Sequence, residues 1–356
     1  MTKMAKQWTF GGDGSRHKGV SVSGDKLTVE EAIQQGGLDW VVEARDAQTA
    51  DSDKIPADDY QQIVRPIIRQ IKEKDADGKE ITRDELGWKT IGMVKSRYRI
   101  VQNRAAFTFF DNATIEGSAI IRAVGHMDFG RVVWALAERS EYECEIYPGD
   151  TIREHLMLYT SHDGKSSVTV RFMPHRVRNG TVLAIGFDRK RRNEVRVRHT
   201  RSAEDRLATV HNLLIEDEGY WKRWRAALLG DDEKPGFRQR LVTPDEIERV
   251  AATLFPAKRK KDDDGNIYEE VSTRAANARA AICARIKEQA DYAKECYETA
   301  GQSAPNGTTA LDVFLGVSEW ATKDLRPRKG GNTFVSTVDG NGAKMRQKAF
   351  DVLCGL

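Results

Sequence analysis

The sequence has 356 residues, 31% of them charged, and its 57 basic and 54 acidic residues leave a formal net charge of only +3. This length allows one large or two smaller domains, while no apolar run approaches a membrane span and the N-terminus lacks the hydrophobic region of a signal peptide. The four cysteines are far apart and none forms a Cys-x-x-Cys pair, which argues against a cysteine zinc site. We therefore expect a cytoplasmic protein with no membrane association, no metal and no cofactor.

The first part of the chain mixes polar and structured segments. Residues 1–27 are rich in Gly, Ser and Lys, and we expect a flexible segment there. Thr28 and Glu31 have the spacing of a capping box that opens a short helix, which Gly36-Gly37 would end. A strand is expected over 38–43 and a loop over 44–60. A polar hairpin or a helical excursion follows, with a turn at Asp77-Gly78.

The middle of the chain predicts a sheet. A strand is expected over 88–101 and a helix over 107–124, where apolar residues recur at helical spacing. Turn residues then separate strand candidates at 131–137, 142–147, 155–160 and 166–173, a pattern typical of an antiparallel meander. A basic strand at 194–200 is expected to join this sheet.

The character changes to helix after residue 200. Apolar spacing and capping signals predict helices over 202–230, 243–255, 273–300, 310–322 and 342–353. A charge-segregated loop near 258–266 interrupts them. The expected fold class is α+β, with an antiparallel β-meander packed with helices and then a mainly helical C-terminal half. We place the two parts at 28–206 and 207–356.

Basic residues concentrate between Arg171 and Arg206, in a chain that is otherwise balanced in charge. Within 194–200, Val195 and Val197 would share one face of a strand while Arg196 and Arg198 share the other, because side chains alternate along a strand. One face could then pack on a core while the other meets a nucleic-acid backbone. The alternative is a solvated edge strand whose arginines protect against aggregation.

Other motifs give weak signals for chemistry. Gly164-Lys165-Ser166 resembles the end of a phosphate-binding loop, but strand rather than helix follows it, which favours a hairpin turn. His126-x-Asp128 and His162-Asp163 lack further ligands at metal-site spacing and are typical of turns. No Gly-x-Ser-x-Gly elbow and no dinucleotide-binding fingerprint occur. The sequence therefore favours a protein that is not an enzyme.

Aromatic residues next to arginines could stack on bases. Tyr98 lies between Arg97 and Arg99 and is the better candidate, although a tyrosine packed in the core is the more common case. Trp221 and Trp224 recur at helical spacing, which favours a place in the core.

Several short segments of the sequence resemble those of a known protein family. They are Gly37-Leu38-Asp39-Trp40-Val41-Val42-Glu43, the run from Tyr98 to Phe107, Ser161-His162-Asp163-Gly164, Arg196-Val197-Arg198-His199-Thr200, Gly307-Thr308-Thr309-Ala310 and Gly340-Asn341-Gly342-Ala343-Lys344. In this order they resemble the phage/plasmid-like protein family whose main domain is the domain of unknown function 932. The resemblance implies a protein of a phage, a plasmid or an integrated element. By analogy of fold, its layout is also similar to single-strand annealing proteins of the Redβ/RecT type.

These observations together predict a protein that binds and anneals single-stranded DNA during homologous recombination without hydrolysing a nucleotide. We expect a homo-oligomer, a ring or a helical filament, to which the helical half contributes contacts. The alternative is a regulatory or anti-defence protein that binds an acidic protein partner. The candidate nucleic-acid-binding residues are Arg97, Tyr98, Arg99, Arg176, Arg178, Lys190, Arg191, Arg192, Arg196, Arg198, His199 and Arg201.

Overall fold

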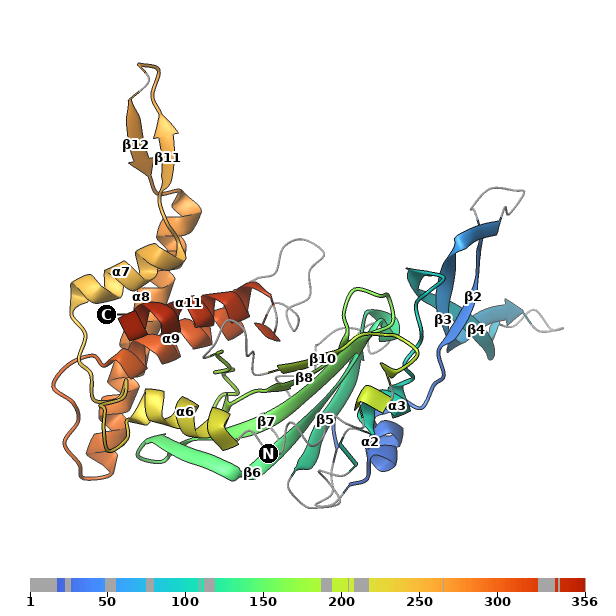
Figure 1. Ribbon diagram of the computed structural model, residues 1–356, viewed down its shortest axis with the longest axis horizontal. Helices are drawn as coiled ribbons and strands as arrows, with labels where there is room; N and C mark the ends of the chain where they lie inside the picture. The colour runs from blue at the N-terminus through green and yellow to red at the C-terminus, as the bar shows by residue number, and fades with distance from the viewer. Residues whose placement is uncertain are drawn as a thin grey trace. The chain divides into compact units, whose positions relative to one another are not determined.

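The computed structural model describes residues 18–22, 27–48, 56–74, 80–108, 110–111, 119–186, 194–203, 205–207, 218–264, 266–325, 337–338 and 340–355. The chain combines antiparallel sheets with helices that dominate its C-terminal part, which confirms the predicted α+β class (Figure 1). Among the described helices, none combines the length and the apolarity needed to cross a membrane.

Two compact units interleave along the sequence. Unit 1 comprises Met1–Glu141, His155–Phe172 and Glu194–Glu216, and unit 2 comprises Tyr142–Glu154, Met173–Asn193 and Asp217–Leu356. The expected division is a single boundary between residues 206 and 207, whereas the observed units alternate along the chain. Two segments of the expected β-meander module pack with the helical part of the chain instead.

The main sheet is antiparallel, with the strand order β1-β5-β6-β7-β8-β10, and β9 pairs with β7 off this path. Its strands are β1 (Lys18–Ser21), β5 (Ile120–Met127), β6 (Val132–Tyr147), β7 (Asp150–Ser161), β8 (Val168–Phe172), β9 (His175–Arg176) and β10 (Glu194–Val197). The expected strands at 131–137 and 142–147 are one continuous strand, β6. Strands β6 and β7 both pass from one unit to the other.

The helix expected over 107–124 is wrong for residues 120–124, while residues 109 and 112–118 lie outside the described part of the chain. A short helix, α3 (Asn103–Phe107), comes earlier, and residues 120–127 form β5. Most of β5 is buried, including Ile121 and every residue from Ala123 to Met127. A short apolar run that is buried on both faces has no period that separates strand from helix, so the spacing misled the prediction.

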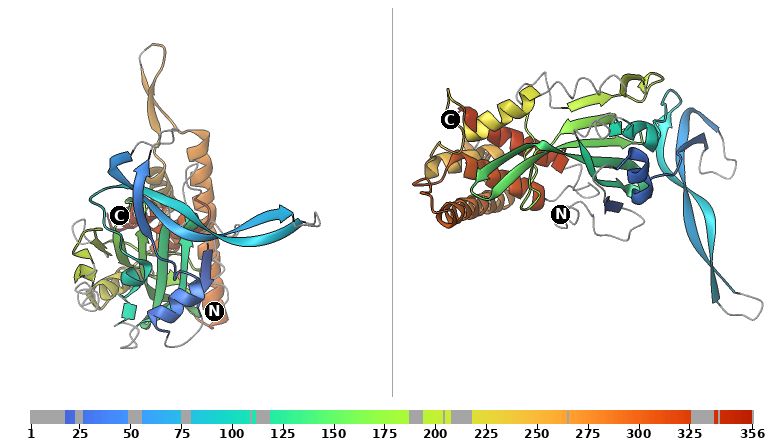
Figure 2. Two further views of the ribbon diagram at one scale, coloured as in Figure 1. Left: turned by 90° about the vertical axis from the view of Figure 1, so that its right-hand side faces the viewer. Right: turned by 90° about the horizontal axis from the view of Figure 1, so that it is seen from below.

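A second sheet has the strand order β2-β3-β4. Its strands are β2 (Glu43–Gln48), β3 (Pro56–Lys74) and β4 (Glu80–Lys95), and Figure 2 shows β3 and β4 as a long twisted ribbon. The hairpin alternative for this region is thus confirmed. The loop expected over 44–60 is wrong for residues 44–48 and 56–60, which form strands, while residues 49–55 and the turn at Asp77-Gly78 lie outside the described residues. The strand expected over 88–101 ends at Lys95.

The strand expected over 38–43 is also wrong for residues 38–42, which are unpaired. The capping box at Thr28 and Glu31 forms as predicted and opens α2 (Val29–Gly36). After it, the Gln102 side chain donates to the carbonyl of Val42 and accepts from its N–H, each over 2.9 Å. A side-chain amide therefore replaces the neighbouring strand that this segment would otherwise need.

Unit 2 contains the long helices α6 (Glu218–Leu229), α7 (Pro244–Leu254), α8 (Thr273–Thr299), α9 (Ala310–Lys323) and α11 (Asn341–Gly355). Thr243 caps α7 through its side chain, with Glu246 bonding back, as predicted. Phe314 of α9 packs edge-on against Phe237 and Phe350, with ring centroids 6.2 and 6.0 Å away. Trp221 and Trp224 are buried, which confirms their predicted place in the core.

The charged segment near 258–266 is a hairpin rather than an irregular loop. It consists of β11 (Lys258–Lys261) and β12 (Ile267–Glu270), which pair in antiparallel register. Arg259 and Lys260 of β11 form ion pairs with Glu269 and Glu270 of β12, so opposite charges support the pairing.

Candidate nucleic-acid interface

Three distant segments of unit 1 meet at the turn that follows β7. The imidazole of His162 is fully buried, and its Nε2 lies 2.9 Å from Oδ1 of Asn103 at the start of α3. The amide nitrogen of Asn103 donates to the carbonyl of Leu38, over 2.9 Å. Trp40 completes the group with its ring edge-on to His162, 5.8 Å between centroids. The side chains of this turn therefore fix the segment before β2 and the start of α3.

A second pair of rings joins the chain after β4 to the chain after β10. Tyr98 and His199 stack with centroids 4.9 Å apart and planes inclined by 22°. The Tyr98 hydroxyl donates to the carbonyl of Ser161 over 3.0 Å, and His199 Nε2 lies 3.1 Å from the Thr160 hydroxyl. The N–H of Arg99 also donates to the carbonyl of His199. The two basic segments are thus held side by side.

Burial sets the charge of these side chains. It lowers the pKa of His162 to about 3, with further lowering from His199 and Arg65. Burial also lowers the pKa of His199, although hydrogen bonds with the backbone of Arg99 and Ser166 act in the opposite direction. Burial and the Asp163 carboxylate raise the pKa of the Tyr98 phenol. All three rings are therefore neutral at pH 7, and the positive charge of the region comes from arginines.

Close backbone contacts and strain mark the same region, and the sequence reasoning missed them. Asp128 and Phe129 are the non-glycine residues with positive φ, at 48° and 59°, among those the structure describes. A Cβ added to Gly130 would lie 2.7 Å from the Arg65 guanidinium, and one added to Gly92 would lie 2.6 Å from the Cα of Asp163. Left-handed backbone in bulky residues costs energy and tends to occur at functional positions. The pattern Asp-Phe-Gly after an apolar run signals a turn but not this strain.

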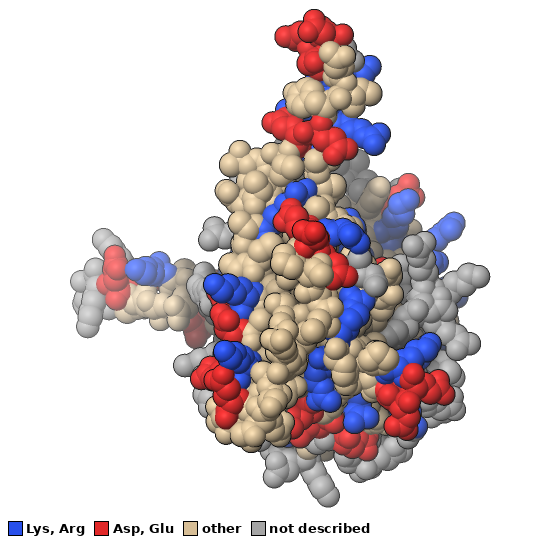
Figure 3. Space-filling model, turned by 90° about the vertical axis from the view of Figure 1, so that its left-hand side faces the viewer, with Lys and Arg blue, Asp and Glu red and all other residues tan. Residues whose placement is uncertain are grey.

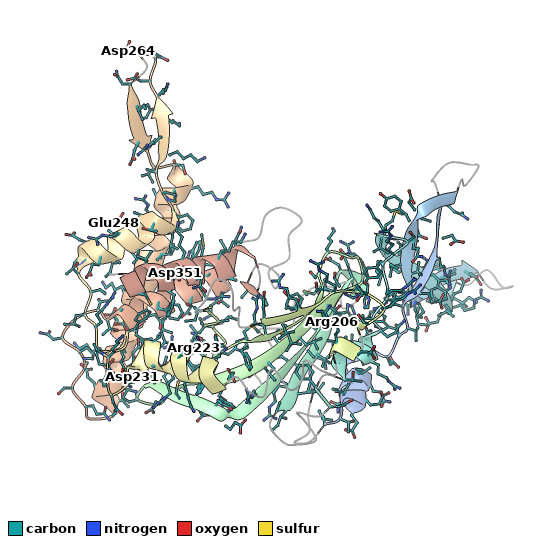
Figure 4. The ribbon with its side chains drawn as sticks, viewed as in Figure 1. Arg206, Arg223, Asp231, Glu248, Asp264 and Asp351 are labelled. Atoms are coloured by element: carbon teal, nitrogen blue, oxygen red, sulfur yellow. The ribbon has the colours of Figure 1, made fainter. Side chains whose placement is uncertain are left out.

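Exposed arginines surround the Tyr98–His199 stack. Arg97 and Arg99 flank Tyr98, while Arg198 and Arg201 lie on either side of His199 in the sequence, and all four side chains are exposed. None of them forms an ion pair with another described residue. We call these four residues the arginine surface. Arg206, labelled in Figure 4, is also exposed, on the short helical segment that follows.

The expected alternation along β10 is only partly present. Val197 is buried and Arg196 is exposed, as predicted, but Arg198 lies just beyond the end of the strand. Arg196 donates to the Glu194 carboxylate over 2.7 Å, and Glu194 also accepts from Arg171 on β8. The pKa of Glu194 is lowered because these two arginines outweigh its burial, so the carboxylate stays ionised and offsets their charge. Arg196 is therefore less available to a phosphate than Arg198.

Two further candidates belong to unit 2. Arg176 is completely buried and bonds Asp150 through Nε over 2.7 Å and through Nη2, so it cannot present its charge to a phosphate. Its Nη1 donates to Gln289 of α8 over 2.5 Å, which makes it part of the core. Arg178 is exposed, and its guanidinium lies 3.6 Å above the ring of Tyr292. Lys190, Arg191 and Arg192 lie outside the described residues.

Unit 2 shows no comparable single-sign surface among the described residues on the face drawn in Figure 3. There, basic and acidic side chains are interspersed, and acidic side chains gather at the end of the β11–β12 hairpin. Asp264, labelled in Figure 4, marks that end. This face of unit 2 therefore offers no surface like the arginine surface to a polyanion.

The candidate residues fall within a known family of domains. Residues 90–347 match the family described as Domain of unknown function (DUF932), so the chain belongs to that family. The matched region contains the whole arginine surface, the His162 turn and most of the helical part of unit 2. No curated protein and no solved structure matches the chain.

Proposed function

We propose that this protein binds single-stranded DNA along the arginine surface and anneals complementary strands, without nucleotide hydrolysis, for a phage, plasmid or integrated element. The observation that supports it best is the set of four exposed arginines without an acidic partner among the described residues, held around one ring stack. Guanidinium groups bind phosphates as paired donors, so such a surface favours a nucleic-acid backbone.

The aromatic pair acts through position rather than through base stacking. One face of Tyr98 is occupied by His199 and its hydroxyl by Ser161, which leaves little of the ring for a base. Its role in this proposal is to hold Arg97 and Arg99 beside Arg198. Because arginine contacts to phosphates carry no sequence information, binding should depend little on base sequence.

The direct experiment replaces Arg97, Arg99 and Arg198 together with alanine. Affinity for an unstructured oligonucleotide should fall at least about tenfold at low salt, and the logarithmic salt slope should decrease by about 2, since each single-strand phosphate contact contributes about 0.7. A matched control removes three exposed charges from unit 2, with Arg274, Lys287 and Lys294 replaced by alanine. The proposal fails if both triple variants bind like the parent protein.

Annealing separates this function from the alternative of an acidic protein partner. A strand-annealing protein should accelerate the pairing of two complementary labelled strands, and the variant that lacks Arg97, Arg99 and Arg198 should not. A protein that uses the same arginines for an acidic partner should leave the pairing rate at its spontaneous value, even if it binds DNA weakly at low salt.

A further inference from the structure

The ribbon of β3 and β4 continues beyond the sheet that β2 shares with it. β2 pairs with β3 only as far as the Glu43–Val64 pair, while β3 and β4 continue together from Arg65–Lys89 to Lys74–Glu80. We call residues 65–74 and 80–89 the arm. Ile68 and Leu86 face each other across it and are 65% and 64% exposed. The described part of the chain therefore covers neither this apolar pair nor the outer edge of β3.

An arm of this kind is unstable alone. Two-stranded ribbons are at best marginally stable in water, and three or more strands are needed for independent stability. A free, partly apolar strand edge is also a template for pairing with another chain. The arm is thus built to gain a strand from elsewhere.

The charge of the outer part of the arm argues for a protein partner. Over 67–74 and 80–87, four basic residues stand against four acidic ones, namely Arg69, Lys72, Lys74 and Arg83 against Glu73, Glu80, Asp84 and Glu85. Arg83 and Glu73 already pair across the ribbon, 3.5 Å apart. Arg69 donates one of its N–H groups to the carbonyl of Trp88 over 2.8 Å, which leaves others for a carboxylate. This outer part has no net charge and so no general attraction for a nucleic-acid backbone. The two further basic residues of the arm, Arg65 and Lys89, lie over the rings of Trp40 and Phe129.

The β3 edge is complementary to itself. When two copies pair in antiparallel fashion about a two-fold axis at Ile71, Ile71 meets Ile71 of the second copy. Arg69 then faces Glu73 of the second copy, and the reverse pair repeats this contact. On the edge of β4, an axis at Arg83 sets two arginines opposite each other at the centre. An axis at Asp84 gives two Arg83–Glu85 pairs but sets two aspartates opposite each other between them, where the β3 edge has two isoleucines. We infer that the arm is a self-association surface, in which β3 of two copies pair about Ile71 to form a four-stranded sheet.

This inference goes beyond the proposed DNA binding, and its test uses the full-length protein without nucleic acid. Sedimentation velocity at about ten micromolar should show wild-type protein as dimers or larger assemblies. R69E alone and E73R alone should each weaken association about tenfold or more, because two attractive pairs become repulsive. An equimolar mixture of the two variants should restore it, since every acidic side chain at these two positions then faces a basic one on the other variant.

The mixture keeps the result distinct from local unfolding of the arm, which mixing would not repair. K287E on α8, an exposed charge reversal far along the sequence, should leave association unchanged. As a second measurement, I71C should form a disulfide-linked dimer under mild oxidation, whereas L86C on the other strand should not. A monomeric wild-type protein, an unrestored mixture or equal crosslinking of I71C and L86C would overturn the inference. None of these results would bear on oligonucleotide binding at the arginine surface.

Discussion

Tyr98 and His199 stack face to face at 4.9 Å, although they come from distant parts of the unit 1 sequence. The contact joins the chain after β4 to the chain after β10 and brings four exposed arginines to one place. Both rings are neutral at pH 7, because burial raises the pKa of Tyr98 and lowers the pKa of His199. The stack is therefore a fixed support for charge that lies beside it.

Arg198 should matter more for binding than its neighbour on β10. R198A should weaken oligonucleotide affinity about threefold to tenfold, whereas R196A should change it less, since Arg196 already serves Glu194. Both variants should melt within a few degrees of wild type, because exposed charges contribute little to stability. Fluorescence anisotropy and thermal melting on the two proteins check this. An equal loss of affinity would show that Glu194 does not hold Arg196 back.

Tyr98 should affect binding without touching the ligand. Y98F keeps the ring stack and loses only the hydrogen bond to Ser161, so it should bind the oligonucleotide nearly as wild type does. Y98A removes the stack and should weaken binding, because the arginines on either side lose their fixed position. Anisotropy titrations on folded protein measure this. Weak binding by Y98F despite a wild-type melting curve would argue that the hydroxyl itself meets the nucleic acid.

His162 should make the fold sensitive to acid. Its folded pKa is about 3, against 6.5 for the free side chain, so between these values the unfolded chain binds a proton that the folded chain does not. Its contribution to stability is complete above pH 6.5 and falls as the pH decreases toward 3, by at most about 1.4 kcal/mol per pH unit. H162Q should show a shallower decrease. Urea unfolding at pH 7, 6 and 5 compares the two, and identical slopes would contradict the assignment.

Arg176 and Asp150 should behave as a buried structural pair. R176A should lower the unfolding free energy by about 3 to 5 kcal/mol, because it leaves the Asp150 carboxylate buried without its partner. D150A should be similarly damaging, and the double variant should cost less than the sum of the two. Chemical denaturation of the three variants gives the coupling energy. A stable R176A variant with reduced DNA affinity would instead indicate that Arg176 contacts DNA.

Local signals in the sequence predicted local structure well. The capping boxes at Thr28 and Thr243 form where expected, since a hydroxyl and a carboxylate three residues apart satisfy the first N–H groups of a helix. The order of strands from β6 to β8 also follows from alternation and turns. For the arm, the sequence indicated a hairpin or a helix and could not decide between them, because both faces are largely exposed and the sequence has no buried period.

The candidate site was predictable in part. Arg97, Arg99, Arg198 and Arg201 are exposed as expected, because they follow or precede strand ends in polar sequence. Arg176 misled the prediction, since its buried partner Asp150 lies 26 residues earlier and no spacing rule connects them. The bond between His162 and Asn103 could not be foreseen either, because their separation of 59 residues depends on the whole sheet.

The path of β6 and β7 through both units decides how this chain can be cut. A fragment ending at residue 206 would keep Tyr147, Arg176 and Leu183 but lose Asp312, Gln289 and Trp224, the side chains that bond to them. The fragment would contain internal cavities and polar groups without hydrogen-bond partners, so it would not fold as an independent domain. Cleavage within the exposed β11–β12 hairpin would break none of these bonds, so that hairpin is a site where a tag or a fluorophore can be inserted with the fold preserved.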